Sequence, residues 1–187
     1  MRESGRTKGP FRRVLRCAPE EYGRHRYLLE IALAPASRPR LAVVLKNPST
    51  ASAERSDPTA GKVEAWARRA GFGALAIVNL FALRSPRPGR LNEVPYGEAV
   101  GKENDRWILR AARGADRIIL AWGDPNGVER ERYERRIREV MRLLKGKETG
   151  VVGVTKKGYP RHGLGWNRGV TLSEAKGLCA ENRDALE

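Results

Sequence analysis

Five polar residues and one glycine stand at or beyond the ends of apolar runs in this sequence. They are Lys46, Asn47, Ser49, Asn79, Gly123 and His162. A side-chain amide both donates and accepts hydrogen bonds, and an imidazole changes its protonation state near neutral pH. Such groups can hold a polar ligand, orient a water molecule or stabilise a developing negative charge. The residue types therefore indicate a site that works through hydrogen bonds.

We interpret Asn47 and His162 as the candidate catalytic residues of this site. His162 is one of two histidines in the chain, and it closes the basic segment TKKGYPRH. The other histidine, His25, lies in YGRHRY, where we expect a surface position. The candidate substrate-binding residues are Lys46, Ser49, Asn79, Gly123, Lys156, Lys157 and Arg161.

Structural roles compete with these interpretations. Asn and Ser often bond to nearby backbone groups in turns, so a turn role for Asn47 and Ser49 stays as open as a functional one. Asn79 ends the apolar run AIVN, and a buried amide needs partners, which either a ligand or the backbone could supply. Gly123 would let a ligand approach the backbone closely. We expect Asp57 to cap a helix rather than to act as a catalytic carboxylate.

Several kinds of site are missing from the sequence. It has no Gly-rich phosphate loop or dinucleotide fingerprint, no Cys/His cluster with zinc spacing and no nucleophile elbow. Cys17 and Cys179 lie near opposite ends of the chain, and we interpret them as structural or incidental. The sequence therefore predicts a site without metal or cofactor, built from Asn, Ser and His side chains.

Apolar runs and amphipathic segments alternate along the chain. The expected strands lie at 26–33, 40–46, 74–79, 117–122 and 150–154, and the expected helices at 57–71, 97–113 and 128–145. Such alternation predicts a three-layer αβα sandwich with a mostly parallel central sheet. The strand at 26–33 is expected at the N-terminal edge, in an antiparallel hairpin with 40–46.

The parallel strands would place the candidate residues together. Carboxyl ends of parallel strands share one edge of the sheet, where open α/β proteins bind their ligands. We therefore expect the side chains of Asn47, Asn79 and His162 to line one crevice at that edge.

Three segments describe the expected domain organisation. Residues 1–24 form a basic N-terminal arm, and residues 25–162 form a single α/β domain. Residues 163–187 form a C-terminal extension, in which TLSE matches a helix-capping box and predicts a short helix from Thr171.

The charge of the chain indicates its class of partner. Its 37 Lys and Arg residues exceed its 22 Asp and Glu residues, which gives a formal net charge of +15. Such a surface attracts polyanions, so we expect DNA or RNA as a partner, although a solvated basic surface with weak affinity is the alternative. No apolar run approaches the roughly 20 residues of a membrane helix. We therefore expect a cytoplasmic protein without membrane association, and the sequence leaves its oligomeric state open.

Several stretches taken in order resemble one known family. RYLLEIAL, KNPSTA, DPT, GFGALAIVNLFALR, AWG and TKKGYPRH are similar to the pattern of the domain-of-unknown-function family numbered 1643, over roughly residues 24–162. The chain departs from that pattern after His162, where it reads Gly-Leu-Gly instead of Pro-Leu-Tyr.

A more distant resemblance implies a function. Asn47-Pro48, Asn79, Trp122-Gly123 and His162 follow the order of motifs in uracil-DNA glycosylase-like proteins. The resemblance implies their fold and hydrolysis of the N-glycosidic bond of a flipped base. In that scheme Asn47 orients the attacking water, Asn79 reads the base and His162 stabilises the leaving base. Lys46 stands where those enzymes carry a Gly-containing run, and no Pro-Ser follows His162.

Two other functions remain open from the sequence. One is a non-catalytic nucleic-acid-binding module that uses the same crevice to hold a base or a phosphate. The other is an enzyme acting on free nucleotides, with the positively charged edge serving a small anionic substrate.

Overall fold

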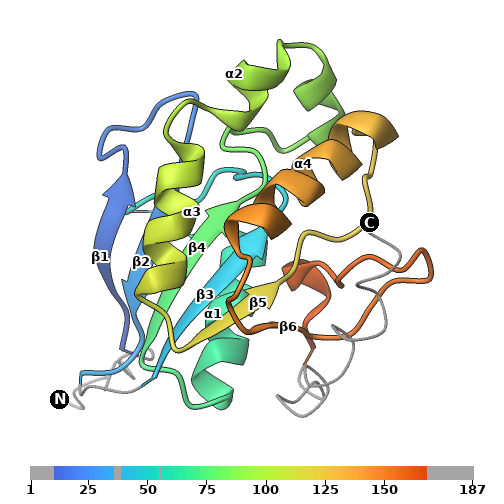
Figure 1. Cartoon of the computed structure of the whole chain (residues 1–187). Helices are drawn as coiled ribbons and strands as arrows, with labels where there is room; N and C mark the ends of the chain where they lie inside the picture. The colour runs from blue at the N-terminus through green and yellow to red at the C-terminus, as the bar shows by residue number, and fades with distance from the viewer. Residues whose placement is uncertain (1–10, 36–38, 55, 168–187) are drawn as a thin grey trace, which may run out of the picture.

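A six-stranded sheet forms the centre of the molecule (Figure 1). The computed structural model describes residues 11–35, 39–54 and 56–167. The strands are β1 (Arg13–Ala18), β2 (Leu28–Ala32), β3 (Arg40–Leu45), β4 (Ala74–Asn79), β5 (Arg117–Leu120) and β6 (Thr149–Val151). The helices are α1 (Pro58–Arg69), α2 (Tyr96–Val100), α3 (Asn104–Arg113) and α4 (Arg130–Leu143), with short 3₁₀ turns η1 (Pro88–Asn92) and η2 (Gly163–Gly165).

The strand order is β1-β2-β4-β3-β5-β6. Strands β4, β3, β5 and β6 run parallel, whereas β1 and β2 pair in the antiparallel sense. The predicted mixed α/β fold with a mostly parallel sheet is therefore confirmed. The predicted hairpin between 26–33 and 40–46 is wrong, because both sides of β3 are occupied by its parallel neighbours β4 and β5. The chain leaving β2 instead bonds beside the start of β4, where the Leu33 amide donates to the Gly73 carbonyl at 2.7 Å.

Helices cover both faces of the sheet. In Figure 1, α3 and α4 lie in front of the sheet and α1 lies behind it. Val63, Trp66 and Ala67 of α1 pack in one apolar core with strand residues such as Val43. Ile108 of α3 and the buried apolar residues of α4 form the second core. Alternate strand residues face the two cores, which explains the continuous apolar runs in the sequence.

The N-terminal edge strand of the sheet is β1, whereas the sequence placed residues 13–18 in a basic arm and expected 26–33 at this edge; β2 instead lies between β1 and β4. Arg13 and Arg16 are exposed, while Cys17 and Ala18 are buried. Cys17 pairs opposite Leu29 of β2. The strand was not predicted because the exposed arginines give this segment the composition of a charged tail.

The helix predicted over 97–113 is two helices in the structure. Gly101 separates α2 from α3 with a φ of +84°, and a Cβ there would lie 2.9 Å from the ring of Tyr27. A left-handed backbone at a tightly packed position favours glycine, so the chain turns here instead of continuing the helix.

Residues just beyond His162 pack onto the domain rather than outside it. Trp166 is 2% exposed, and its ring lies 4.8 Å from the ring of Trp66 in α1. The domain therefore extends past the boundary predicted at residue 162. The predicted helix from Thr171, like Cys179, lies outside the described residues. Within the described ranges, no helix has the length and apolar character needed to cross a membrane.

The connections separate from one another at the carboxyl edge of the sheet. The chain leaves β3 toward α1 behind the sheet, whereas it leaves β5 toward α4 in front of it (Figure 1). Strands β3 and β5 are direct neighbours, so their following segments separate at this point. Such a switch point is where open α/β sheets bind ligands.

Candidate functional site

A cavity of about 260 Å³ lies at the carboxyl edge, between the segment after β3 and the start of α1. We call it the edge cavity. Its lining includes the polar residues Arg26, Lys46, Asn47, Asp57, Ser85 and His162. The segments that meet here are far apart in sequence. The cavity therefore exists only in the folded chain.

A second cavity, of about 190 Å³, lies at the opposite edge of the sheet. Its lining includes Arg40 and Ala74, the first residues of β3 and β4. Its Arg40 guanidinium is already paired with Glu30 and bonded to the Gly114 carbonyl. The chemically unsatisfied groups lie instead at the carboxyl edge, so we place the candidate site there.

The side chain of Asn47 is oriented by its neighbours. Its Nδ2 donates to the carbonyl oxygens of Ser85 at 2.8 Å and Pro48 at 3.1 Å. Carbonyl oxygens only accept, so the amide nitrogen must face them and Oδ1 must face the other way. No hydrogen bond to this Oδ1 is formed within the part of the chain that the structure describes. Asn47 therefore offers an oriented acceptor at the wall of the edge cavity.

His162 presents the complementary group, a donor. Its Nδ1 accepts from the backbone amide of Leu164 at 3.2 Å, so a neutral ring must carry its proton on Nε2. Burial, together with the nearby charge of Lys46, lowers the pKa of His162 to about 4, against a smaller opposing effect of Asp57. The ring is therefore neutral at pH 7.

Gly123 positions His162 rather than approaching a ligand. Its φ is +70°, and a Cβ at this position would lie 2.8 Å from the Cβ of His162. Its amide donates to the carbonyl of Pro160 at 2.9 Å, which holds the segment before His162 against the end of β5. Gly123 does not line the edge cavity, so the expected role in ligand approach is replaced by one in packing.

Lys46 lies at the wall of the edge cavity with only 3% of its surface exposed. Its Nζ donates to the main-chain oxygen of Asp124 and lies 5.6 Å from the centre of the Tyr133 ring. Burial lowers the pKa of Lys46 to about 8, and Asp124 partly opposes that effect. Lys46 therefore joins the end of β3 to the loop after β5, and it keeps a desolvated charge beside His162.

Asn79 is fully buried at the end of β4, as the sequence suggested, but it does not line the edge cavity. It pairs beside Leu45 and follows Ile77 by two residues, so strand alternation places it on the face to which these lining residues belong. Among the residues that the structure describes, neither its Oδ1 nor its Nδ2 has a hydrogen-bond partner. A buried amide without partners is costly, which makes Asn79 an unusual residue for a purely structural position.

The structure thus brings some of the candidate residues together and separates others. Lys46, Asn47, Ser49 and His162 all line the edge cavity. The three basic residues of TKKGYPRH do not line it. They are Lys156, Lys157 and Arg161, and all three are exposed. These side chains are available to a larger partner but not to a ligand inside the cavity.

Arg26 is a lining residue that the sequence did not reveal. It is 2% exposed, and its Nη1 donates to the carbonyl of Ala51 at 3.0 Å. Burial and the neighbouring Arg84 lower the pKa of Arg26 to about 10, and Asp57 partly opposes them. In the sequence Arg26 stands among other charged residues, and no local pattern distinguishes it from a surface arginine.

Asp57 caps α1 as predicted, and it also lines the edge cavity. Its Oδ1 accepts from the Ala60 amide at 2.8 Å, while its Oδ2 accepts from the Ala51 amide at 3.2 Å. The carboxylate therefore joins the start of α1 to the polar loop that follows β3. Across the described ranges, no cluster of three or more His, Cys, Asp or Glu side chains could hold a metal ion.

A protein-family model described as "Protein of unknown function (DUF1643)" matches residues 26–164. This range contains every lining residue of the edge cavity. No curated protein and no solved structure matches the chain.

Proposed function

The chain belongs to the DUF1643 family, and we propose that it hydrolyses the N-glycosidic bond of a nucleotide in DNA or RNA. The proposal follows the resemblance of its motifs to those of uracil-DNA glycosylase-like proteins. The observation that carries it is the pairing, in one cavity, of an oriented acceptor on Asn47 with a neutral donor on His162.

The reaction needs both kinds of group. Breaking an N-glycosidic bond leaves positive charge on the sugar and negative charge on the departing base. The Nε2–H of His162 donates to a carbonyl oxygen of the base as that charge develops. One preorganised donor of this kind typically lowers the barrier by roughly 2.7–4 kcal/mol.

Asn47 acts on the attacking water. Its free Oδ1 accepts a hydrogen bond from the water and fixes the direction of attack. An amide cannot remove the proton, so its contribution is orientation rather than base catalysis, and the proton that the water releases goes to the departing base anion. Lys46 lies close enough to His162 for its charge to lower the pKa of the ring. Its ammonium therefore adds positive charge on the side where the base departs.

Asn79 supplies base recognition in this scheme, which requires the edge cavity to open toward its fully buried amide, because Asn79 does not line the cavity in this structure. Its unpartnered amide can pair with one donor and one acceptor on the edge of a base. Extruding a base costs a few kcal/mol, which contacts between the phosphates and the basic surface offset.

The decisive test is a single-turnover assay of base release. The substrates are DNA and RNA oligonucleotides with deaminated, damaged or mismatched bases, without added metal. His162→Ala should lower the rate of the chemical step by roughly 100- to 1,000-fold with little change in binding. Asn79→Ala should broaden the range of bases released. His25→Ala is the matched control, because the Nε2 of His25 bonds to the Glu98 carbonyl, outside the edge cavity.

Two results would contradict the proposal. If His162→Ala releases the base at the wild-type rate, the chemistry resides elsewhere. If no substrate loses a base although the wild type binds nucleic acid tightly, a non-catalytic nucleic-acid-binding module is the better account.

A second candidate is an enzyme acting on free nucleotides. The observation that favours it is the presence of two buried cations, Arg26 and Lys46, in a cavity of limited volume. Release of base from free nucleotides, but not from oligonucleotides, would select it.

A further inference from the structure

Two buried cationic side chains line the edge cavity, and neither has an ion-pair partner in the part of the chain that the structure describes. Arg26 is 2% exposed and Lys46 is 3% exposed. Neither has a carboxylate oxygen within 4 Å among the described residues. Moving a charge out of water costs several kcal/mol unless an opposite charge compensates it. An unpaired cation in a cavity wall therefore favours an anionic ligand.

A third buried cation in the same chain shows the usual arrangement. Arg136 is fully buried, and it pairs with Asp105 at 2.5 Å and with Glu139 at 3.1 Å. Its Nε also donates to the Leu80 carbonyl at 2.6 Å. Two carboxylates thus compensate the charge of Arg136, whereas Arg26 and Lys46 form no such pairs among the described residues.

The carboxylates nearest to the two cations are engaged elsewhere. Both oxygens of Asp57 accept backbone amides, from Ala60 and from Ala51. Oδ1 of Asp124 accepts the hydroxyl of Thr155 at 2.6 Å, and Lys46 reaches only the main-chain oxygen of that aspartate. These carboxylates reduce the positive potential of the cavity but do not cancel it.

The two cations also keep unused donors. Nε of Arg26 is buried and has no partner, and only its Nη1 makes a hydrogen bond within the described residues. The ammonium of Lys46 has three N–H groups, of which one is used on the Asp124 carbonyl. With His162 neutral, the charged lining groups are Arg26, Lys46 and Asp57. Their formal sum is positive.

We propose that the edge cavity contains an oxyanion subsite, formed by Arg26 and Lys46, that binds a phosphate group. Phosphate supplies several acceptor oxygens, and the fork of an arginine together with the point charge of a lysine matches them. The subsite deepens the proposed function. It rests on that function only in the identity of the molecule that carries the phosphate. In a free nucleotide this is the terminal phosphate, whereas in nucleic acid it is a phosphodiester beside the flipped nucleotide.

Thermal unfolding of the full chain tests the subsite. The probe is inorganic phosphate at pH 7, with ionic strength held constant by chloride. A ligand that binds only the folded state raises the midpoint temperature in a saturable way. We expect such a rise for the wild type, and we expect Lys46→Met and Arg26→Lys each to weaken phosphate binding at least 10-fold. Arg26→Lys keeps the charge and removes the fork, so it separates geometry from net charge.

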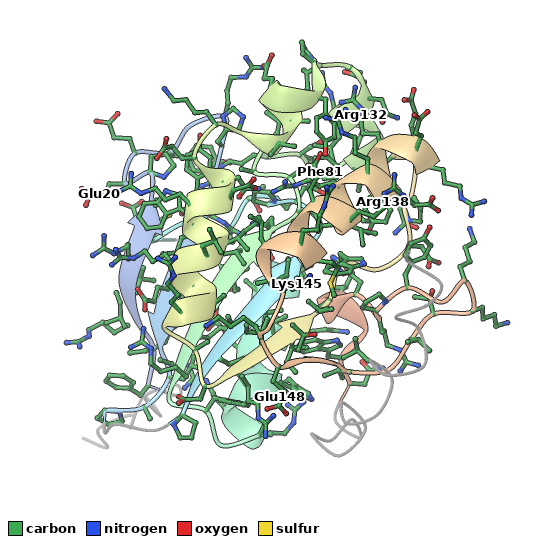
Figure 2. All side chains as sticks on the ribbon, in the orientation of Figure 1. Glu20, Phe81, Arg132, Arg138, Lys145 and Glu148 are labelled. Atoms are coloured by element: carbon green, nitrogen blue, oxygen red, sulfur yellow. The ribbon has the colours of Figure 1, made fainter. Side chains whose placement is uncertain are left out.

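Lys145→Met is the matched control. Lys145 is exposed in the turn between α4 and β6, at the amino edge of the sheet (Figure 2). Lys145→Met removes the same charge as Lys46→Met, but at a position away from the edge cavity. The affinity of this variant for phosphate should therefore stay at the wild-type value. Each variant is compared with its own phosphate-free midpoint, which removes differences in basal stability.

Further titrations in the same experiment identify the molecule that carries the phosphate. A nucleoside 5′-monophosphate, the matching nucleoside and a dinucleotide with one internal phosphodiester are titrated in parallel. Tighter binding of the monophosphate indicates a free nucleotide, and tighter binding of the dinucleotide indicates nucleic acid.

Two outcomes would overturn the subsite. One is a wild type whose midpoint does not respond to phosphate, and the other is an unchanged response in Lys46→Met. If Arg26→Lys does not fold, the comparison of Lys46→Met with Lys145→Met decides. The base-release assay reports separately: phosphate binding without base release removes the proposed function alone, and base release without phosphate binding removes the subsite alone.

Discussion

At the scale of single residues, the candidate site depends on the protonation of His162. Its Nδ1 is occupied by the Leu164 amide, so a neutral ring carries its proton on Nε2. Burial and the charge of Lys46 both oppose addition of a second proton. A ring that stays neutral can stabilise a departing anion as a hydrogen-bond donor without first competing with solvent for a proton.

The stability of the chain should therefore fall in mild acid. The pKa of His162 is lowered from 6.5 to about 4, so below pH 6.5 the unfolded chain binds a proton that the folded chain excludes. Stability is full above pH 6.5 and is lost as pH falls toward 4. Between pH 7 and pH 5 the loss from this group is about 2 kcal/mol.

Urea denaturation of the wild type and of His162→Gln across this pH range measures the effect. The difference between the two proteins isolates His162 from carboxylates that begin to titrate near pH 5. Lys46 and Asp57, the charged groups that act on the ring, are present in both. Parallel pH curves for the two proteins would show that the ring is not desolvated.

At the scale of elements, the end of β5 determines where His162 lies. Gly123 adopts a φ of +70°, and its Cα leaves space that the Cβ of His162 fills. The hydroxyl of Tyr133 on α4 donates to the Gly123 carbonyl at 2.7 Å, which fixes this turn from the other side. The position of the histidine thus depends on a strand end, a helix and a glycine.

Gly123→Ala should displace His162 while the fold persists. The new Cβ would lie 2.8 Å from the Cβ of His162. A left-handed backbone at alanine also lowers the stability of the folded state by roughly 1–2 kcal/mol. We expect lower stability, a rise in the pKa of His162 measured by NMR titration, and loss of base release.

Gly146→Ala provides the matched control for this change. Gly146 has a φ of +79°, and a Cβ there meets nothing within 4 Å. This variant should lose only the stability that the left-handed backbone costs an alanine, and it should leave the pKa of His162 unchanged. Equal behaviour of the two variants would mean that Gly123 has no part in positioning the histidine.

At the scale of the whole molecule, the net charge of +15 controls the encounter with polyanions. Many arginines are engaged in surface ion pairs, such as Arg130 with Glu134 and Arg135 with Glu139 on α4. Figure 2 shows charged side chains extending outward on several sides of the molecule. Lys156 is exposed and lies outside the edge cavity, so it is available to such a partner.

Binding to nucleic acid should depend steeply on salt. For a footprint of about 5 phosphates on duplex DNA, log affinity should fall against log salt with a slope near −4 to −5. If Lys156 and Lys157 each contact a phosphate, alanine at either position should reduce the slope by about 1. Fluorescence anisotropy across a salt series measures it, with Lys145→Ala as the control at the amino edge. A flat titration would favour the free-nucleotide candidate.

The sequence by itself determined the order and type of most elements. The apolar run 74–79 is β4, and Asp57 caps α1, because strand periodicity and helix capping act between residues close in the chain. It also placed Asn47 and His162 at strand or loop ends that share one edge. Local chemistry was sufficient for these inferences.

Only the tertiary structure decided which residues form the cavity wall. Arg26 became a lining residue through its bond to Ala51, and Gly123 acquired its role through contact with His162. Asn79 is fully buried at the end of β4 and does not line the cavity, although Ile77 of the same strand does. Burial and long-range packing depend on contacts between residues that are distant in sequence, and no local pattern encodes them.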